Sequence, residues 1–487
     1  MTAIGRSMDV DAQTPGHCIV PDSSGSRVLL VAAREVGSAA SGAWSLPIVR
    51  VNEEWWSPNW LGHIIGQVRR ALAVDVTVLR HLQGAPLWVL ELENHSGGWE
   101  PPPNARWVSR EELGSLQLAP PELRVPLEGW FAEAEGGWAS PLRAPWERRG
   151  WLREATSWIE QQLARLGETP AGPVEQLKGA WYVSCVLRVP TARGALYFKA
   201  DRALPPSEAE LVSALAARWP GRVPDIVAMD AGRRWMLVRD FGADVLEPDY
   251  DRPLPPLARW EAAVRCFARL QIEAAAHGGE WLALGCADWR GPRLARRFGE
   301  LAGDDAALGR GESWGLSDAE IRQLRRLVPR VAELCAHLTS VGVPDSLVHL
   351  DFSGRNIVPA GGGFLFYDWS DAAVGHPFLS GANVVRDVRY PIEEQAPGPS
   401  GVPAVVALSG AARQRFVRDA YLEPWTAYAP AEGLRKAFGI AARLRPVWRA
   451  VRAHRELPSV EPAPPWAADL ARSIPAELRD AIVQLAR

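Results

Sequence analysis

The sequence predicts an α+β protein in which a mixed first domain is followed by a strand-rich segment and then a helical one. Three observations lead to this fold class. Short apolar strands flank one amphipathic helix in residues 27–113, and two strands precede a helix in residues 183–215. After an irregular, proline-rich stretch at 247–256, helical periodicity is found at 260–276, 318–338, 411–428 and 432–454. The predicted divisions are a flexible N-terminus at 1–20, a first domain at 21–135, a linker at 136–150, a strand-rich lobe at 151–245 and a helical lobe at 246–487.

In the first domain, residues 27–32 form an apolar strand and residues 60–73 form a helix. One face of that helix carries the apolar side chains Leu61, Ile64, Ile65, Val68 and Leu72. Further strands are expected at 76–79 and 87–92, before a closing segment at 106–113. The linker is predicted because residues 136–150 combine paired glycines, two prolines and a charged run.

Composition restricts the partners. The 487 residues carry a net charge of -3, which argues against a nucleic-acid partner because phosphate backbones require a basic face. No long uninterrupted apolar stretch predicts a membrane span, and the N-terminus lacks the pattern of a signal peptide. We therefore expect a cytoplasmic protein, and its abundant Ala, Arg, Gly, Pro and Trp are typical of GC-rich bacterial genomes. The five cysteines show no C-x-x-C spacing, so neither a zinc site nor a disulfide framework is predicted. The sequence does not indicate an oligomeric state.

Residues 349–368 hold the strongest functional signal. His349, Asp351 and Asn356 have the H-x-D-x4-N spacing of a kinase catalytic loop, in which the Asp orients or deprotonates a substrate hydroxyl and the Asn binds Mg²⁺. The alternative is that the two polar residues cap turns and the His packs in a core. The surrounding pattern of strand, loop, strand, glycine turn and strand ends at Asp368, which places polar groups where a metal would be held.

The segments His349-Leu350-Asp351 to Asn356, Tyr367-Asp368-Trp369 and Gly375-His376-Pro377 resemble the aminoglycoside phosphotransferase and choline kinase-like (APH) family. This resemblance implies a bilobal protein-kinase-like fold with a β-rich small lobe and a helical large lobe. It also implies that Asp351 is the catalytic base, that Asn356 and Asp368 bind Mg²⁺, and that ATP or GTP donates the phosphoryl group. Leu350 replaces the family's usual glycine, which could alter the geometry of the loop but removes no catalytic group.

The same resemblance assigns nucleotide-binding residues in the small lobe. Lys199, expected at the end of a strand at 195–198, would pair the α- and β-phosphates, although a solvated strand end is the commoner role of lysine. Glu208 fits the family's E-A-x-L pattern better than Glu210 and would be its carboxylate partner. Residues 177–184, with Gly179 and Ser184, would cover the phosphates, and residues 237–242, with Arg239 and Phe241, would form the connection between the lobes that contacts adenine.

The first domain resembles a Nudix hydrolase over about residues 20–130. The resemblance rests on the W-x-L-P pattern at 44–47 and on W-V-S-x-E-E-L at 107–113, and it implies an α/β/α fold. Where that family has R-E-L-x-E-E, residues 70–75 keep one acid, Asp75, so this Mg²⁺ site is predicted to be degenerate. Ligand binding or docking is the expected role. A chance match to a general α+β pattern is the alternative, and active carboxylates elsewhere would have to be Glu53, Glu54 or Glu91.

Two functions remain open. One is a small-molecule O-phosphotransferase that moves the γ-phosphoryl group of ATP or GTP to a substrate hydroxyl with Mg²⁺. The other is a pseudokinase-type regulatory protein that binds nucleotide or another ligand and carries an inactive Nudix-like docking domain. Retention of Asp351, Asn356 and Asp368 favours the enzyme. The acceptor is expected to be a hydroxylated small molecule, such as an aminoglycoside, amino alcohol or sugar. The aromatic side chains of Trp281, Trp289 and Trp314 could either stack on a sugar or pack in a core.

Overall fold

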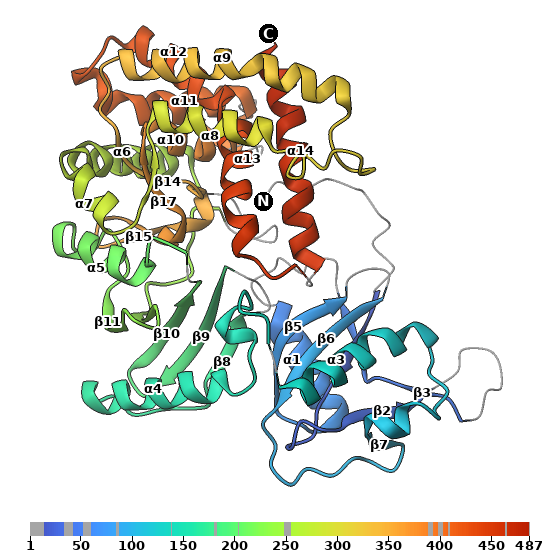
Figure 1. Cartoon of the computed structure of the whole chain (residues 1–487). Helices are drawn as coiled ribbons and strands as arrows, with labels where there is room; N and C mark the ends of the chain where they lie inside the picture. Colours follow the sequence, from blue (N-terminus) through green and yellow to red (C-terminus); the bar gives the residue numbers. More distant parts are fainter. Residues whose placement is uncertain are drawn as a thin grey trace. The chain divides into compact units, whose positions relative to one another are not determined.

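The computed structural model describes residues 14–33, 42–51, 60–83, 87–137, 139–179, 183–202, 204–247, 255–387, 393–397, 403–407, 410–462 and 465–486. The chain divides into two compact units, whose elements are labelled in Figure 1. The first comprises Met1–Arg202 and Val460–Ala468, and the second comprises Ala203–Ser459 and Asp469–Arg487. Among the described residues, none of the helices has the length and apolar character that crossing a membrane requires.

The first unit contains ten strands and four α-helices among its described residues. The strands are β1 (Thr14–Ile19), β2 (Val28–Ala32), β3 (Trp44–Ser45), β4 (Ile48–Val51), β5 (Val76–Gln83), β6 (Trp88–Asn94), β7 (Ala105–Val108), β8 (Glu175–Lys178), β9 (Ser184–Thr191) and β10 (Gly194–Asp201). The helices are α1 (Trp60–Leu72), α2 (Arg110–Leu113), α3 (Arg124–Gly136) and α4 (Trp151–Leu166).

A four-stranded sheet of order β4-β1-β6-β5 forms the centre of the N-terminal part. Strands β1 and β6 are parallel, whereas β4 and β5 pair antiparallel with their neighbours. The buried side of α1 packs on one face through residues such as Ile64 and Val68, and α3 packs on the other through Trp130 and Phe131 (Figure 1). A second sheet of order β3-β2-β7 completes this α/β/α arrangement.

Two expectations for the first domain need correction. The predicted flexible N-terminus at 1–20 includes β1, whose residues from His17 to Ile19 are buried between two neighbouring strands, while residues 1–13 lie outside the described part. The predicted helix at 60–73 ends at Leu72 because Ala73 has a positive φ of 53°. The E-E-L pattern near residue 113 has a local cause, since Ser109 and Glu112 form a reciprocal capping box at the start of α2.

The segment predicted as a linker is packed rather than open. Arg143, Trp146 and Glu147 are all buried, and Gly150 donates its backbone N–H to the Glu93 carboxylate at 2.7 Å. Glycine and proline interrupt regular structure, but that property alone does not place a segment in solvent. The two compact units divide between residues 202 and 203, so the predicted lobe at 151–245 contributes residues to both, and the predicted domain boundaries stay predictions.

The second unit begins with α5 (Glu208–Arg218) and the hairpin of β11 (Ile226–Asp230) and β12 (Trp235–Arg239). Its other strands are β13 (Ala287–Trp289), β14 (Ser346–His349), β15 (Ile357–Ala360), β16 (Gly363–Phe366), β17 (Ala372–Gly375), β18 (Glu393–Pro397) and β19 (Pro403–Ala407). Its other helices are α6 (Leu257–Ala274), α7 (Gly278–Ala283), α8 (Gly291–Gly303), α9 (Asp318–Ser340), α10 (Phe378–Asp387), α11 (Gly410–Leu422), α12 (Ala431–Arg443), α13 (Arg445–Glu456) and α14 (Pro465–Leu485).

Most predicted helices of this unit are present, with changed boundaries. The segment expected to be one helix at 432–454 is two helices, and Pro446 lies in the first turn of the second, where its missing N–H costs no hydrogen bond. The predicted helix at 411–428 ends at Leu422 and continues as a 3₁₀ segment. Trp281 and Trp289 are almost completely buried, so they belong to the hydrophobic core. Of the irregular stretch expected at 247–256, residues 248–254 lie outside the described part.

Candidate active site

The predicted catalytic segment lies in the second unit, between and within strands that pair antiparallel. Strand β14 pairs with β17, and β15 pairs with β16 so that Ile357 lies opposite Phe366. Beyond that pair, the Tyr367 backbone N–H donates to the carbonyl of Asn356 at 3.1 Å. The polar residues that follow β14, precede β15 and follow β16 are thereby held at one end of the hairpin. The predicted strand, loop and hairpin pattern is confirmed.

Asn356 is bonded directly to Asp351. Its Nδ2 donates to the Asp351 carbonyl at 2.8 Å and lies 3.3 Å from Asp351 Oδ2. A backbone carbonyl can only accept, so the Asn356 amide must present its nitrogen to Asp351 and its oxygen to the other side. That orientation leaves Oδ1 as the atom with which Asn356 could bind a cation. Asn356 is buried and Asp351 is half-buried.

Asp368 has an unusual backbone conformation, with φ 63° and ψ 57°. A left-handed conformation is uncommon outside glycine, although aspartate tolerates it better than most residues. The Ser370 hydroxyl donates to Asp368 Oδ1 at 3.3 Å, and the short helix η5 (Trp369–Asp371) begins directly after it. The backbone turns sharply here, which brings the carboxylate to the end of β16 rather than along the strand.

His349 supports this turn from the core. It is fully buried, and its Nε2 lies 2.9 Å from the Tyr367 carbonyl, the peptide group that precedes Asp368. Burial lowers the pKa of His349 despite the nearby carboxylates of Asp351 and Asp368. The neutral ring therefore donates to the carbonyl through Nε2–H. The His349 backbone N–H donates in turn to the Ser380 hydroxyl on α10 at 2.9 Å.

Glu208 makes a contact that the sequence did not indicate. As the first residue of α5, it is 1% exposed, and its Oε1 accepts a hydrogen bond from the backbone N–H of Trp369 at 3.0 Å. Trp369 directly follows Asp368 and is itself fully buried, with its ring centroid 4.8 Å from that of His349. Glu208 thus fixes the start of η5, whatever else it binds.

Of the two residues predicted to connect the lobes, Phe241 lies beside the candidate site and Arg239 is exposed. Phe241 packs against Tyr367, with ring centroids 4.9 Å apart, so it lies beside the residue that precedes Asp368. Arg239 is exposed at the end of β12, and its Nε pairs with Asp225 at 3.1 Å. This ion pair joins the two strands of the β11–β12 hairpin region and gives Arg239 a local structural role.

The catalytic loop requires glycine at position 354 because neighbouring atoms leave no room for a side chain. A Cβ at this position would lie 2.4 Å from the Trp260 ring and 2.7 Å from Cβ of Glu247. The loop also accepts a backbone hydrogen bond at the Gly354 carbonyl from the Glu247 N–H at 3.1 Å. Leu350, which replaces the family's usual glycine, is 4% exposed and belongs to the main hydrophobic core of this unit. The departure is therefore accommodated by packing.

Lys199, Gly179 and Ser184 belong to the first unit. Lys199 is half-buried within β10, opposite Val186, and β10 continues to Asp201, so the expected strand end at Lys199 is wrong. Gly179 follows β8 and has no room for a side chain, because a Cβ would meet the Gln176 side chain at 2.7 Å. Ser184 begins β9 with its hydroxyl buried and without a hydrogen-bond partner among the described residues. Residues 180–182 of the predicted phosphate-covering loop lie outside the described part.

The donor set fits a hard cation. An amide oxygen from Asn356 and a carboxylate from Asp368 are the oxygen ligands that Mg²⁺ uses, and it commonly takes only one or two carboxylates together with substrate phosphates. The described residues contain no group of three or more His, Cys, Asp or Glu side chains arranged for a metal. Such a group is not needed for a Mg²⁺ ion that a nucleotide brings with it.

Sequence comparison identifies the class of this segment. Residues 179–396 match the model of the phosphotransferase enzyme family, APH, and this range contains every residue predicted to bind nucleotide or metal or to act in catalysis. The matched part of the chain is thus similar to phosphotransferases, which supports a kinase-type enzyme. The match does not reach residues 21–135, so the Nudix resemblance stays a prediction. A search of curated proteins found no match.

Solved structures with similar architecture include three phosphotransferases or kinases. A macrolide 2′-phosphotransferase type I is 16% identical, with a TM-score of 0.41, and the alignment covers 65% of this chain and 95% of that one. A choline/ethanolamine kinase family protein from Mesorhizobium loti is 13% identical, with a TM-score of 0.43 and coverages of 68% and 98%. A macrolide 2′-phosphotransferase from Brachybacterium faecium is 14% identical, with a TM-score of 0.43 and coverages of 67% and 98%. Similarity at this level carries no argument about the substrate.

Proposed function

We propose that the chain transfers the γ-phosphoryl group of ATP or GTP to a hydroxyl group of a small molecule, with Asp351 as the base. The observation that carries this proposal is the direct bond between Asn356 and Asp351, at 2.8 Å to the carbonyl and 3.3 Å to the carboxylate. It joins a candidate base to a candidate metal ligand in the arrangement that phosphoryl transfer uses. The match of residues 179–396 to a phosphotransferase family supports the same reaction class.

Asn356 and Asp368 are the residues that would hold Mg²⁺. When bound, Mg²⁺ would neutralise charge on the β- and γ-phosphates. The protein's own part is positioning. The Tyr367–Asn356 backbone bond at 3.1 Å fixes the spacing between the two ligands, and the Glu208–Trp369 bond at 3.0 Å fixes the turn at Asp368. These bonds restrict the backbone before substrate binds, which lowers the cost of reaching the reactive geometry.

Asp351 would accept the proton of the acceptor hydroxyl as the oxygen attacks the γ-phosphorus. His349 is not a competing base, because it is fully buried and its lowered pKa keeps it neutral while Nε2–H serves the Tyr367 carbonyl. Retention of the base and both metal ligands argues against a purely regulatory pseudokinase. Within the first unit, Lys199 remains the proposed phosphate-binding ammonium, and Gly179 with Ser184 the proposed phosphate-covering residues.

The test is an ATP- and GTP-consumption screen of the full-length protein against aminoglycosides, macrolides, choline, other amino alcohols and sugars. Asp351→Asn preserves size and polarity, so it should retain Mg·ATP affinity and lower kcat by about 10²- to 10⁴-fold, the usual contribution of a general base. Phosphoryl transfer at an unchanged rate by this variant would refute Asp351 as the base. The absence of any acceptor-dependent turnover by the parent protein would refute the proposed function itself.

A further inference from the structure

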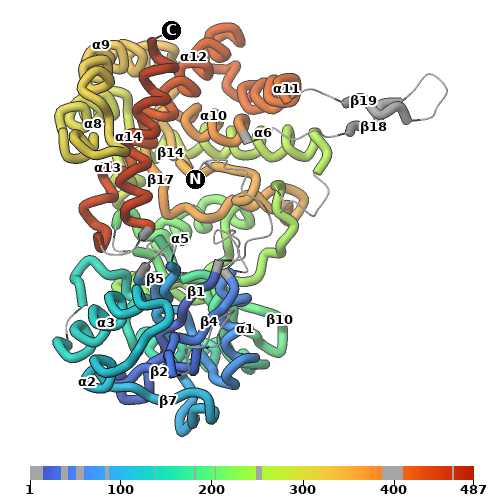
Figure 2. The backbone as a smooth tube through the Cα atoms, turned by 90° about the vertical axis from the view of Figure 1, so that its right-hand side faces the viewer, coloured from blue at the N-terminus to red at the C-terminus, as the bar shows by residue number. Residues whose placement is uncertain are grey.

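Helix α13 carries a row of arginines at positions 445, 449 and 452. These positions are four and seven residues apart from the first, so the three side chains follow one side of the helix. The middle arginine pairs with Glu477 on α14, which lies beside α13 in both views (Figures 1 and 2). Of the two outer arginines, Arg445 is linked through Asn383 to the loop that contains Asp351, and Arg452 bonds Asp371, which follows Asp368.

Arg445 acts on the catalytic loop through one intermediate side chain. Its Nε donates to Asn383 Oδ1 at 2.8 Å, and Asn383 Nδ2 donates to the Leu350 carbonyl at 2.6 Å. The guanidinium can only donate and the carbonyl can only accept, so both ends of the relay fix the same orientation of the Asn383 amide. The carbonyl at the end of the relay belongs to the peptide bond that joins Leu350 to Asp351. The relay therefore fixes the plane of the peptide from which the Asp351 side chain projects.

Arg452 acts on the metal-binding turn. Its Nη2 lies 2.9 Å from Asp371 Oδ2, and Asp371 ends the short helix η5 that begins after Asp368. The Asp371 side chain is only 8% exposed, so its charge depends on a partner within the protein. The Glu456 carboxylate accepts from Arg452 Nε at 3.0 Å and holds the guanidinium in place. The ion pair thus anchors the far end of η5 and engages a carboxylate that lies three residues from the metal ligand.

We propose that Arg445 and Arg452 are positioning residues for phosphoryl transfer, so that α13 sets the relative placement of Asp351 and Asp368. This inference rests on the proposed function, since it assigns roles within that same site. Arg445 bonds Asn383 and Arg452 bonds Asp371, so both arginines act through intermediate residues rather than on Asp351 or Asp368 directly. The two effects are separable, because one relay ends at the peptide that carries the base and the other ends at the turn that carries the metal ligand.

The row of arginines supplies its own control. Arg449 and Arg452 have similar side-chain exposures of 19% and 22%, and their partners Glu477 and Asp371 are 13% and 8% exposed. Arg449→Gln removes one ion pair from this helix, to Glu477, whereas Arg452→Gln removes two, to Asp371 and Glu456. Only the Arg452–Asp371 pair involves a catalytic segment, and the Arg452→Lys variant separates loss of charge from loss of folding. Any loss of function due to weaker folding alone should appear in both variants. Arg452→Lys keeps a positive charge opposite Asp371 and tests rescue.

The experiment measures Mg²⁺-dependent ATP binding by calorimetry, together with kcat and KM for the acceptor found in the screen. Arg452→Gln should weaken Mg·ATP binding by about 10-fold, the low end of the effect of losing a direct partner of a metal ligand, because Arg452 bonds Asp371 rather than Asp368 itself. Arg452→Lys should recover most of this loss, and Arg449→Gln should bind as the parent does. Asn383→Asp keeps a partner for Arg445 but loses the donor to Leu350, so it should lower kcat on the order of 10- to 100-fold at unchanged nucleotide affinity.

Equal Mg·ATP affinity in Arg452→Gln and Arg449→Gln would overturn the role of Arg452, and an unchanged kcat in Asn383→Asp would overturn the role of the Arg445 relay. A parent protein that binds Mg·ATP but transfers no phosphoryl group would refute the proposed function instead. In that case the comparison of the two glutamine variants by calorimetry still decides whether Arg452 positions the metal-binding turn.

Discussion

Replacing Glu147 with glutamine should make the protein more stable at alkaline pH relative to the parent. Glu147 is 2% exposed, and no donor among the described residues bonds either of its carboxylate oxygens. Burial, reinforced by the nearby Glu461 and Glu91 carboxylates and opposed by Arg80 and Arg143, raises its pKa from 4.5 to about 8. The folded protein therefore holds a proton on Glu147 at neutral pH, which the unfolded chain would release.

The direction and size of the pH effect on the unfolding free energy follow from the difference in the pKa of Glu147 between the folded and unfolded states. Because the pKa of Glu147 is higher in the folded state than in the unfolded state, its contribution to stability is fully present below pH 4.5 and declines until pH rises through about 8. Each pH unit within this window costs about 1.4 kcal/mol of unfolding free energy, and the slope flattens near the folded pKa. Between pH 6 and pH 8 the parent should lose about 2 kcal/mol through this group, whereas glutamine does not titrate.

The assay is urea unfolding of the full-length protein at pH 6, 7 and 8, followed by tryptophan fluorescence, since Trp130 and Trp146 are buried in the same unit. The quantity of interest is the difference in unfolding free energy between variant and parent at each pH, which cancels other titrating groups. Glu128→Gln, at an exposed position on α3, is the control and should show no trend with pH. A difference that stays constant from pH 6 to pH 8 for the Glu147 variant would show that Glu147 is not protonated in the folded protein.

Three further outcomes are expected. Asp368→Ala should abolish phosphoryl transfer and weaken Mg²⁺-dependent nucleotide binding in the same calorimetric titration; intact turnover with unchanged affinity would remove Asp368 from the metal site. Arg143→Met should lower the unfolding free energy by about 3–5 kcal/mol, because it removes the partner of the buried Glu461 carboxylate and leaves Glu133 with Arg80 alone, whereas Arg188→Met, which breaks an exposed pair, should cost under about 1 kcal/mol. Full-length protein carrying Asp351→Asn should release no phosphate from a panel of nucleoside diphosphate compounds with Mg²⁺, since Asp75 alone cannot clamp a diphosphate; robust release would place active carboxylates elsewhere in the first domain.

The catalytic segment was predictable because its chemistry is local in sequence. His349, Asp351, Asn356 and Asp368 fall within twenty residues, and the apolar runs between them predict strands that the structure confirms. Neither the Asn383–Leu350 bond nor the Arg452–Asp371 pair could be inferred in this way. Their partners are 33 residues apart in the first case, and they meet only after α10 and α13 have packed.

Glu208 and the linker show a second limit. The sequence favoured Glu208 as a phosphate-site residue, but it could not indicate the bond to the Trp369 N–H, because a backbone donor leaves no signature in residue identity. In the linker, composition predicted a boundary between domains at 136–150, and Trp146 and Glu147 within it are buried. Within its charged run, Arg149 pairs with the buried Glu91 at 3.0 Å, whereas the Glu147 carboxylate has no hydrogen-bond partner among the described residues.

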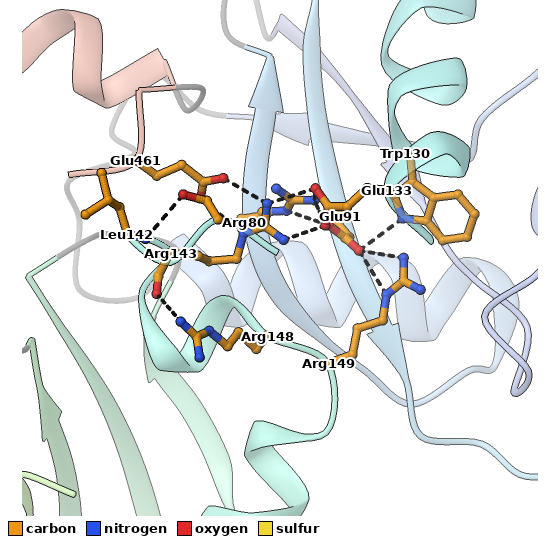
Figure 3. A network of polar contacts seen from close by, with 10 residues as sticks. Arg80, Glu91, Trp130, Glu133, Leu142, Arg143, Arg148, Arg149 and Glu461 are labelled. Carbon is orange, nitrogen blue, oxygen red and sulfur yellow. Dashed lines mark hydrogen bonds and ion pairs between the residues drawn. The ribbon is translucent and has the colours of Figure 1, made fainter. Parts of the chain in front are cut away.

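A network of buried and partly buried ion pairs joins the first domain to other segments of the first unit (Figure 3). Glu91, in the middle of β6, accepts from Arg80 at 2.6 Å, from Trp130 at 3.0 Å and from Arg149 at 3.0 Å (Figure 3). Arg143 donates to Glu133 at 2.8 Å and to Glu461 at 2.8 Å, so it joins the first domain to the segment Val460–Ala468 (Figure 3).

Three guanidinium groups are thus bonded to three carboxylates, and their burial is tolerable only while the pairs are complete. A fragment that ends near residue 140 would keep Arg80, Glu91 and Glu133 but lose Arg143, Arg149 and Glu461. Glu91 and Glu133 would then keep only Arg80 of these three guanidinium groups, and the resulting loss of stability would be confused with a loss of function. Glu461 also follows the end of α13 by only five residues, so the chain leads directly from this network to the helix that carries Arg445 and Arg452.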